Sequence, residues 1–266
     1  YPDYLSGVSL GRVAYETFPL TAENDFLPDL DAIPEETARR AKFIYINYPN
    51  NPTGAVATKA FYEKLVAWAK TYEVGVVSDL AYGALGYQGY ENPSFLSTPG
   101  AKDVGIEFYT FSKTFNMAGW RLAFAAGNDQ MIEALNLIQD HLFVGIFPAL
   151  QEAGIAALLD PKSEEAVAQL NATYDSRRDA FVQAAAKIGW QAFPSRGSFY
   201  AWMPVPEGYT SESFADLLLE KVHVAVAPGK GFGPAGDAYV RIGLLVEPER
   251  LVEAVDRIAN LHLFNN

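Results

Sequence analysis

The chain has 266 residues, half of them hydrophobic, so it is long enough to bury one large core or two ordinary ones. Its formal net charge of −12 argues against a nucleic-acid surface, because phosphate contacts need clustered Lys and Arg. It has no cysteine for disulfides or thiolate metal sites, and no apolar run of the roughly 20 residues that span a bilayer. We therefore expect a cytoplasmic protein that binds neither nucleic acid nor membrane.

The first half of the chain alternates short apolar runs with amphipathic stretches. The expected strands cover residues 42–48, 74–78, 105–109 and 121–127. Between the first two strands, Thr58 is placed to cap a helix that runs to Tyr72. Near-continuous apolar strands joined by a helix predict an α/β fold, with a parallel sheet covered by helices on both faces. Residues 80–104, rich in Gly, Tyr and Pro, are expected to form a long loop.

The second half of the chain begins with a helical stretch over residues 129–159, which Pro148 is predicted to break or kink. Beyond Asp160-Pro161-Lys162 the pattern changes. We therefore expect a large domain of residues 1–160 and a smaller α+β domain of residues 161–266. In the smaller domain, helices are expected over residues 164–188, 213–222 and 249–261, and strands over residues 198–203, 224–226 and 239–244.

Lys113 lies among small hydroxyl residues, directly after the apolar strand of residues 105–109. Desolvation at such a place lowers the pKa of an amine, so the neutral nucleophilic form becomes accessible near neutral pH. A lysine of this kind can form an imine with an aldehyde cofactor. The alternative is an ordinary lysine at a strand end, with its ammonium group in water.

Two further polar residues follow predicted strands, namely Asn51 in a proline-rich turn and Asp79. In parallel sheets, ligands bind at the carboxyl ends of the strands, so we expect Asn51, Asp79 and Lys113 to face one crevice. Taken singly, Asn51 is also explained as a turn residue before proline, and Asp79 as a helix N-cap or a turn aspartate.

Four motifs in this order resemble those of the class I/II aminotransferases, which are pyridoxal-phosphate enzymes of the aspartate aminotransferase fold. The motifs are Asn51-Pro52-Thr53-Gly54, Asp79-Leu80-Ala81-Tyr82, Ser112-Lys113 with Arg121 eight residues on, and Tyr239-Val240-Arg241. The resemblance covers essentially the whole chain, but it corresponds to the later part of a complete family chain. The N-terminal arm and the glycine/serine phosphate loop of the family have no counterpart in this sequence.

The resemblance implies a role for each of these residues toward pyridoxal 5′-phosphate. Lys113 would hold the cofactor's aldehyde carbon and then act as general base and acid. Asp79 would keep the pyridine nitrogen protonated, so that the ring can accept negative charge. Asn51 and Tyr82 would hydrogen-bond the cofactor's 3′-oxygen, and Asn51 would also contact the substrate carboxylate.

The resemblance also implies which residues bind the cofactor's phosphate, bind the substrate's carboxylate and stack on the cofactor ring. Thr110, Ser112 and Arg121 match the family's phosphate-binding set, in which Ser or Gly usually stands at the position of Thr110; threonine keeps the hydroxyl. Arg241 would clamp the substrate's α-carboxylate, and a structural salt bridge is the alternative. Tyr1 matches the position of an aromatic ring that stacks on the cofactor.

The resemblance implies an aminotransferase that moves an amino group between an L-amino acid and a 2-oxo acid, and that forms a homodimer when full-length. Residues 114–121 and 139–144 look most similar to the methionine-salvage aminotransferases of bacilli, which convert 4-methylthio-2-oxobutanoate to methionine. Two alternatives stay open. One is a pyridoxal-phosphate-dependent β-lyase that uses the same lysine, and the other is a catalytically inactive, aminotransferase-like sensing domain.

Overall fold

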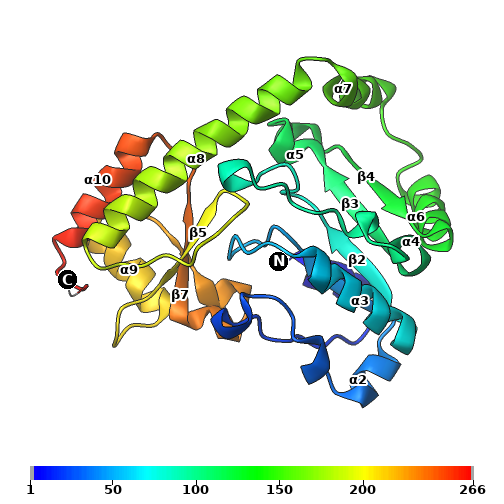
Figure 1. The fold of residues 1–266 in the computed structure, drawn as a ribbon, viewed down its shortest axis with the longest axis horizontal. Coiled ribbons are helices and arrows are strands. Elements are labelled where there is room, and N and C mark those ends of the chain that lie inside the picture. The colour runs from blue at the N-terminus through cyan, green and yellow to red at the C-terminus, as the bar shows by residue number, and fades with distance from the viewer. Residues whose placement is uncertain (1–2, 265–266) are drawn as a thin grey trace. The chain divides into compact units, whose positions relative to one another are not determined.

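The computed structural model describes residues 3–264, and the chain divides into two compact units (Figure 1). Unit 1 consists of Tyr1–Asp29, Asn50–Ala55 and Thr173–Asn266, and unit 2 consists of Leu30–Pro49 and Val56–Ala172. The expected domains, residues 1–160 and 161–266, remain a prediction. The compact units differ from them, because two N-terminal segments group with the C-terminal residues and the later boundary lies inside helix α8 (Ser163–Lys187).

Unit 2 is built on a four-stranded sheet with the strand order β1-β2-β3-β4. The strands are β1 (Phe43–Asn47), β2 (Gly75–Asp79), β3 (Gly105–Thr110) and β4 (Ala123–Gly127). The first three strands are parallel, and β4 runs antiparallel to β3. The mostly parallel sheet predicted from the sequence is therefore confirmed, and the residues that follow β1, β2 and β3 leave the sheet at the same edge.

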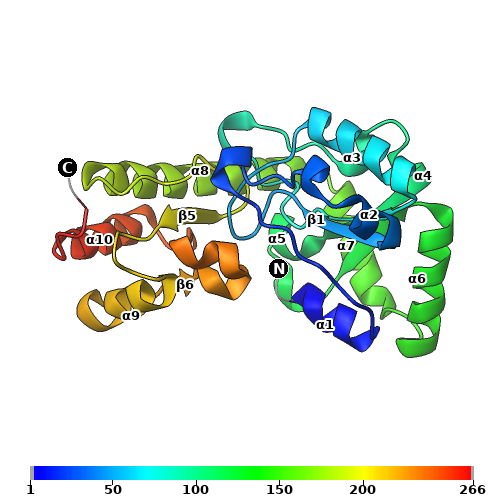
Figure 2. The same ribbon diagram turned by 90° about the horizontal axis from the view of Figure 1, so that it is seen from below.

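Helix α3 (Lys59–Tyr72) connects β1 to β2 and lies above β1 in the view of Figure 2. The side chain of Thr58 accepts a hydrogen bond from the backbone N–H of Phe61 at 3.1 Å, which is the N-cap predicted from the sequence. The helix buries one face, which consists of Phe61, Tyr62, Leu65, Val66 and Ala69. Apolar residues spaced in this way form the stripe that fixes an amphipathic helix against a core.

A long loop follows β2, as predicted, and ends in the short helix α4 (Ala101–Val104). The buried carboxylate of Glu107 on β3 attaches this loop to the sheet. It accepts hydrogen bonds from Phe95 N at 2.8 Å, from Ser78 Oγ at 2.9 Å and from Ser94 Oγ. Buried polar groups are normally hydrogen-bonded, and two of the donors to Glu107 belong to the loop. These hydrogen bonds therefore fix the loop to β3.

Two helices complete the second half of unit 2, namely α6 (Asp129–Leu142) and α7 (Pro148–Leu159). The predicted break at Pro148 is confirmed. The proline occupies the start of α7, where a helix does not need a backbone N–H. Two shorter helices, α1 (Asp3–Leu10) and α2 (Glu35–Arg40), lie nearer the N-terminus. Within residues 3–264, no helix is long and apolar enough to cross a membrane.

Unit 1 contains an antiparallel sheet with the order β5-β7-β6, the part of α8 from Thr173 onward, and the helices α9 and α10. The bounds are β5 (Tyr200–Pro204), β6 (Ala227–Pro228), β7 (Tyr239–Gly243), α9 (Ser211–Val222) and α10 (Pro248–Ala259). One face of the sheet joins the helices in a single core. This core includes Ala201, Met203, Val240 and Ile242 from the sheet and Phe181, Phe214, Leu218, Leu251 and Val255 from the helices.

The strand predicted over residues 224–226 is wrong, because the paired residues are Ala227 and Pro228. His223 ends α9 in a left-handed conformation with a φ of 58°, and Val224 N donates to Leu218 O. His223 and Val224 therefore form the C-terminal cap of α9 and do not begin a strand. The ladder is short because proline has no backbone N–H to donate to a neighbouring strand.

The turn of residues 50–55, which contains Pro52, is closed by its own hydrogen bonds. Asn50 Oδ1 accepts hydrogen bonds from Thr53 Oγ1 at 2.8 Å and Thr53 N at 3.2 Å, and Asn50 N donates to Ala55 O at 2.8 Å. Gly54 has a φ of +70°, and a Cβ on it would lie 2.5 Å from the Cβ of Ser195. Only glycine fits this position without strain, which explains the Gly of the Asn-Pro-Thr-Gly motif.

Candidate active site

The ends of β2 and β3 carry two of the residues selected from the sequence. Asp79 is the last residue of β2 and pairs in register with Phe108 of β3. Lys113 lies in the four-residue helix α5 (Phe111–Thr114), which directly follows β3. Because the two strands are neighbours and parallel, both side chains belong to the same edge of the sheet in unit 2.

Contacts with neighbouring residues hold Asp79 in place. Its Oδ1 accepts a hydrogen bond from Ala81 N at 3.2 Å, and its backbone carbonyl accepts one from Asn47 Nδ2 at 2.9 Å. Asn47 is the buried last residue of β1, and it was not among the residues predicted from the sequence. It could have been found from the sequence, because it is a polar residue at the end of an otherwise apolar strand. Tyr82, which is buried, follows in the same turn.

The turn after β3 brings two hydroxyl groups together. Thr110 caps α5, since its Oγ1 accepts a hydrogen bond from Ser112 N at 3.2 Å. The same Oγ1 lies 3.0 Å from Ser112 Oγ, to which it donates. Lys113 is the next residue in this turn.

Arg121 brings a second positive charge to Lys113. It follows the short helix η5 (Ala118–Trp120) in a left-handed conformation with a φ of 54°, and its Nη1 donates to Ala118 O at 3.1 Å. Burial lowers the pKa of the half-buried Lys113, and the charge of Arg121 lowers it further. The arrangement therefore makes the amine of Lys113 less basic and brings positive charge that suits a bound anion.

Unit 1 contains the other two predicted residues that the structure describes. Arg241 on β7 donates from Nη1 to Asn51 Oδ1 at 2.6 Å, and Asn51 is buried. The described carboxylates form no ion pair with Arg241, so the alternative of a structural salt bridge receives no support within residues 3–264. Tyr1 lies outside the described residues. That Asn51, Asp79 and Lys113 share one crevice stays a prediction.

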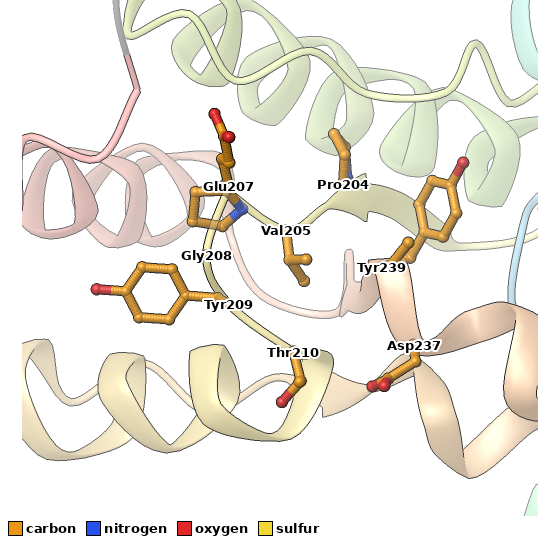
Figure 3. Close-up of a pocket in the computed structure, with 10 residues that line it drawn as sticks. Pro204, Val205, Glu207, Gly208, Tyr209, Thr210, Asp237 and Tyr239 are labelled. Carbon is orange, nitrogen blue, oxygen red and sulfur yellow. The ribbon is translucent and has the colours of Figure 1, made fainter.

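An open hollow of about 510 Å³ lies elsewhere in unit 1 (Figure 3). Its lining comes from two segments, residues 204–210 and residues 237–239. None of the predicted site residues lines it. The hollow is formed where β5 leads into α9, and it does not coincide with the residues selected from the sequence.

Comparison with known proteins places these residues in a family. Residues 1–258 match the family model described as aminotransferase class I and II. The chain is 56% identical over 264 residues to the L-glutamine–4-(methylsulfanyl)-2-oxobutanoate aminotransferase of Bacillus subtilis, which covers 99% of this chain and 66% of that protein. It is 48% identical over 258 residues to the LL-diaminopimelate aminotransferase of Moorella thermoacetica, which covers 97% of this chain and 66% of that protein.

The solved structures agree with the sequence comparison. The chain superposes on apo BacF from Bacillus subtilis with a TM-score of 0.94 and 45% identity, covering 100% of this chain and 68% of that one. The chain thus spans about two thirds of the length of the relatives it matches. Because the family model matches nearly all of its residues, this chain belongs to the class I and II aminotransferases, a family of pyridoxal-phosphate-dependent enzymes.

Proposed function

We propose that the protein is an aminotransferase that moves an amino group between an L-amino acid and a 2-oxo acid. The observation that carries the proposal is the composition of the sheet edge in unit 2. A carboxylate ends β2, and the turn after β3 holds two hydroxyl groups and an amine whose pKa is lowered by burial and by Arg121. An amine with a lowered pKa beside a charged partner marks a candidate functional site, and the neighbouring carboxylate and hydroxyl groups supply the other groups that this chemistry needs.

The residues of unit 2 fit pyridoxal 5′-phosphate. The hydroxyl groups of Thr110 and Ser112 and the guanidinium of Arg121 are the donors that a phosphate group requires. The carboxylate of Asp79 suits a protonated pyridine nitrogen, and a neutral Lys113 suits an aldehyde carbon. When bound, the cofactor supplies an electron sink for the negative charge that develops on the substrate's α-carbon.

The protein's own groups then have separate tasks. In its neutral form, Lys113 Nζ would take the proton from the substrate's α-carbon, and as an ammonium group it would deliver that proton to the carbon of the cofactor's aldehyde. Asp79 keeps the proton on the ring nitrogen. Tyr82 and Asn51 are proposed to hydrogen-bond the cofactor's 3′-oxygen. Arg241 is proposed to bind the substrate's α-carboxylate with two parallel hydrogen bonds, while Asn51 fixes one of its nitrogens.

For the substrates, we propose 4-(methylsulfanyl)-2-oxobutanoate as amino acceptor and glutamine as donor. The name of the Bacillus subtilis relative, which is 56% identical to this chain, supports this pair. The Moorella thermoacetica relative, which is 48% identical, points to LL-diaminopimelate instead.

Covalent trapping is expected to mark Lys113. Reduction of the protein with borohydride in the presence of pyridoxal phosphate should leave an adduct on this residue, because its lowered pKa makes the neutral amine accessible. Peptide mass mapping locates the adduct. Lys230 is the matched control, since a hydrogen bond with Glu212 raises its pKa and keeps it charged. Equal labelling of Lys230 and Lys113 would contradict the proposed role of Lys113.

The substitution Arg121→Gln should shift the reactivity of Lys113 to higher pH. Removing the positive charge removes one cause of the lowered pKa, so the neutral fraction of Lys113 falls at a given pH near neutrality. Part of the lowering should persist, because burial is its larger cause. The measurement is the rate of acylation of Lys113 as a function of pH. Arg40→Gln, at an exposed position in unit 2, is the control and should leave the profile unchanged.

Product analysis tests the substrates. With glutamine as donor and 4-(methylsulfanyl)-2-oxobutanoate as acceptor, methionine should form at a rate that depends on the concentration of both. Replacement of glutamine by LL-diaminopimelate should give a lower kcat/KM. A higher value with LL-diaminopimelate would reassign the substrate, and release of pyruvate from cystathionine without a 2-oxo acid would indicate a β-lyase.

We also propose that the protein acts as a homodimer. Support comes from the connection between α6 and α7, where Leu142, Phe143, Val144 and Phe147 are 68% to 85% exposed. Adjacent apolar side chains in water are typical of an interaction surface. Val144→Lys combined with Phe147→Lys should reduce the dimer fraction in analytical ultracentrifugation. Leu219→Lys on α9, where an apolar side chain is also exposed, should not. A monomeric unsubstituted protein would contradict the proposal.

A further inference from the structure

The sheet of unit 1 has two different faces. Successive side chains of a strand point to opposite faces, so the core residues Ala201, Met203, Val240 and Ile242 alternate with Tyr200, Trp202, Tyr239 and Arg241 on the other face. Arg241 is paired in register with Trp202, and Tyr200 is paired with Gly243. Because Gly243 has no side chain, the diagonal neighbours Tyr200 and Arg241 can approach each other.

Aromatic rings surround the guanidinium of Arg241. Its Cζ lies 4.1 Å from the centre of the Tyr200 ring and 4.7 Å from the centre of the Phe232 ring. Among the hydrogen bonds described within residues 3–264, Arg241 uses one of its five N–H donors, through Nη1 to Asn51 Oδ1. A planar guanidinium stacks well on aromatic faces, and stacking leaves its edge open to a planar anion.

The position of the Phe232 ring is fixed by its own segment. Phe232 ends the short helix η6 (Gly229–Phe232), and its ring packs edge-on against Trp202 with centroids 6.1 Å apart. The helix η7 (Pro234–Ala238) follows. Gly229 lies so close to Gly236 that a Cβ on it would come within 2.1 Å of the Gly236 carbonyl oxygen. The close approach of these two backbones holds the segment that carries Phe232.

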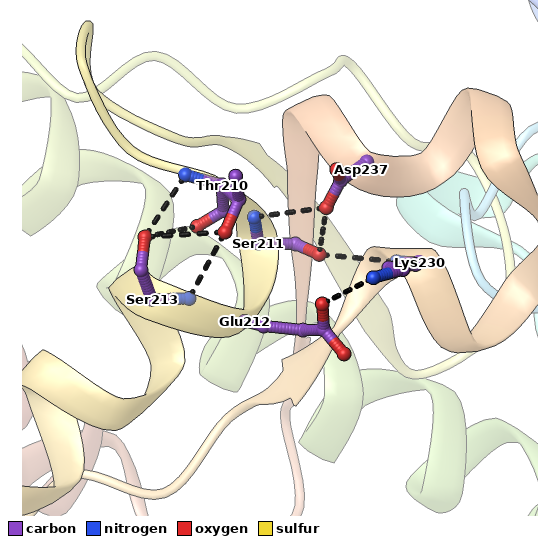
Figure 4. A network of polar contacts seen from close by, with 6 residues as sticks. All are labelled: Thr210, Ser211, Glu212, Ser213, Lys230 and Asp237. Carbon is purple, nitrogen blue, oxygen red and sulfur yellow. Dashed lines mark hydrogen bonds and ion pairs between the residues drawn. The ribbon is translucent and has the colours of Figure 1, made fainter.

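Polar contacts attach the same segment to α9 (Figure 4). The hydroxyl of the buried Ser211 donates to Asp237 Oδ1 at 2.7 Å and accepts from Lys230 N at 3.2 Å. Lys230 Nζ also pairs with Glu212. Ser211 therefore joins both ends of residues 230–237 to the start of α9, which restricts the motion of the Phe232 ring between them.

We propose that Tyr200 and Phe232 are positioning residues for the substrate's carboxylate, an inference that rests on the proposed function. Their rings hold the guanidinium of Arg241 in one plane and shield its faces from water. The side chain then presents its edge to a carboxylate without first losing rotational freedom. Arginine side chains otherwise lose considerable conformational entropy when they become ordered. Loss of either ring should weaken binding of the carboxylate and leave the proton transfer at Lys113 unchanged.

A binding assay tests the proposal without any reaction. The full chain, with ¹⁵N-labelled arginine, is titrated with propionate, and the Nε–H signal of Arg241 is followed by NMR; the signal is assigned by its loss in Arg241→Lys. Phe232→Leu and Tyr200→Leu should each weaken propionate binding about fivefold, the effect of one lost cation–π contact. Phe232→Tyr and Tyr200→Phe keep a ring and should bind as the unsubstituted protein does.

Phe193→Leu is the matched control, because the Phe193 ring packs against Phe26 and has no contact with Arg241 among those described. Equal affinity in the control and in both ring variants would overturn the proposal, as would the lack of any response of Arg241 to propionate. Two separate rings keep the test informative if one variant does not fold.

Steady-state kinetics extends the test to turnover. Phe232→Leu should raise KM for the amino acid about fivefold and change kcat less than about twofold, because the ring acts on binding and not on the chemical step. A fall in kcat with unchanged KM would contradict a positioning role. If trapping at Lys113 fails while propionate binding still depends on both rings, the proposed function is wrong and the positioning of Arg241 stands.

Discussion

The parallel pairing of β2 with β3 is the constraint on which the candidate site depends. It places the end of one strand, with its carboxylate, beside the turn that follows the other, with its amine and hydroxyl groups. No local motif produces this proximity, since Asp79 and Lys113 are separated by a long loop. The anchor of that loop at Glu107 lies on β3 as well, so one strand positions both the loop and the amine.

The cationic side chains of Lys113 in unit 2 and Arg241 in unit 1 lie in different electrostatic environments. In unit 2, Lys113 is made less basic by burial and by a neighbouring guanidinium, which destabilises its charged form in the absence of an anion. In unit 1, the guanidinium of Arg241 lies among neutral partners, namely the amide of Asn51 and the rings of Tyr200 and Phe232. A carboxylate or phosphate stabilises both arrangements, so the binding of anions and the local stability of these segments are linked.

The sequence predicted those features that depend on neighbouring residues. Thr58 and Pro148 mark helix starts through caps and missing donors, and Asp79 and Lys113 follow apolar runs that are strands. Two features that depend on contacts between distant segments were not predicted. The pairing of residues 227–228 instead of 224–226 depends on where β7 lies, and the rings around Arg241 come from separate segments. The roles of the site residues remain predictions, with Tyr1 outside the described part.

The division of the chain into units has a consequence for engineering. The backbone passes between the units at residues 29–30, 49–50, 55–56 and 172–173. No single peptide bond therefore separates one intact unit from the other, and a fragment made by truncation at any point lacks part of at least one of them. Modules of this protein could be exchanged with those of a relative only by grafting several segments together. Limited proteolysis should likewise yield nicked chains that stay associated, instead of autonomous halves.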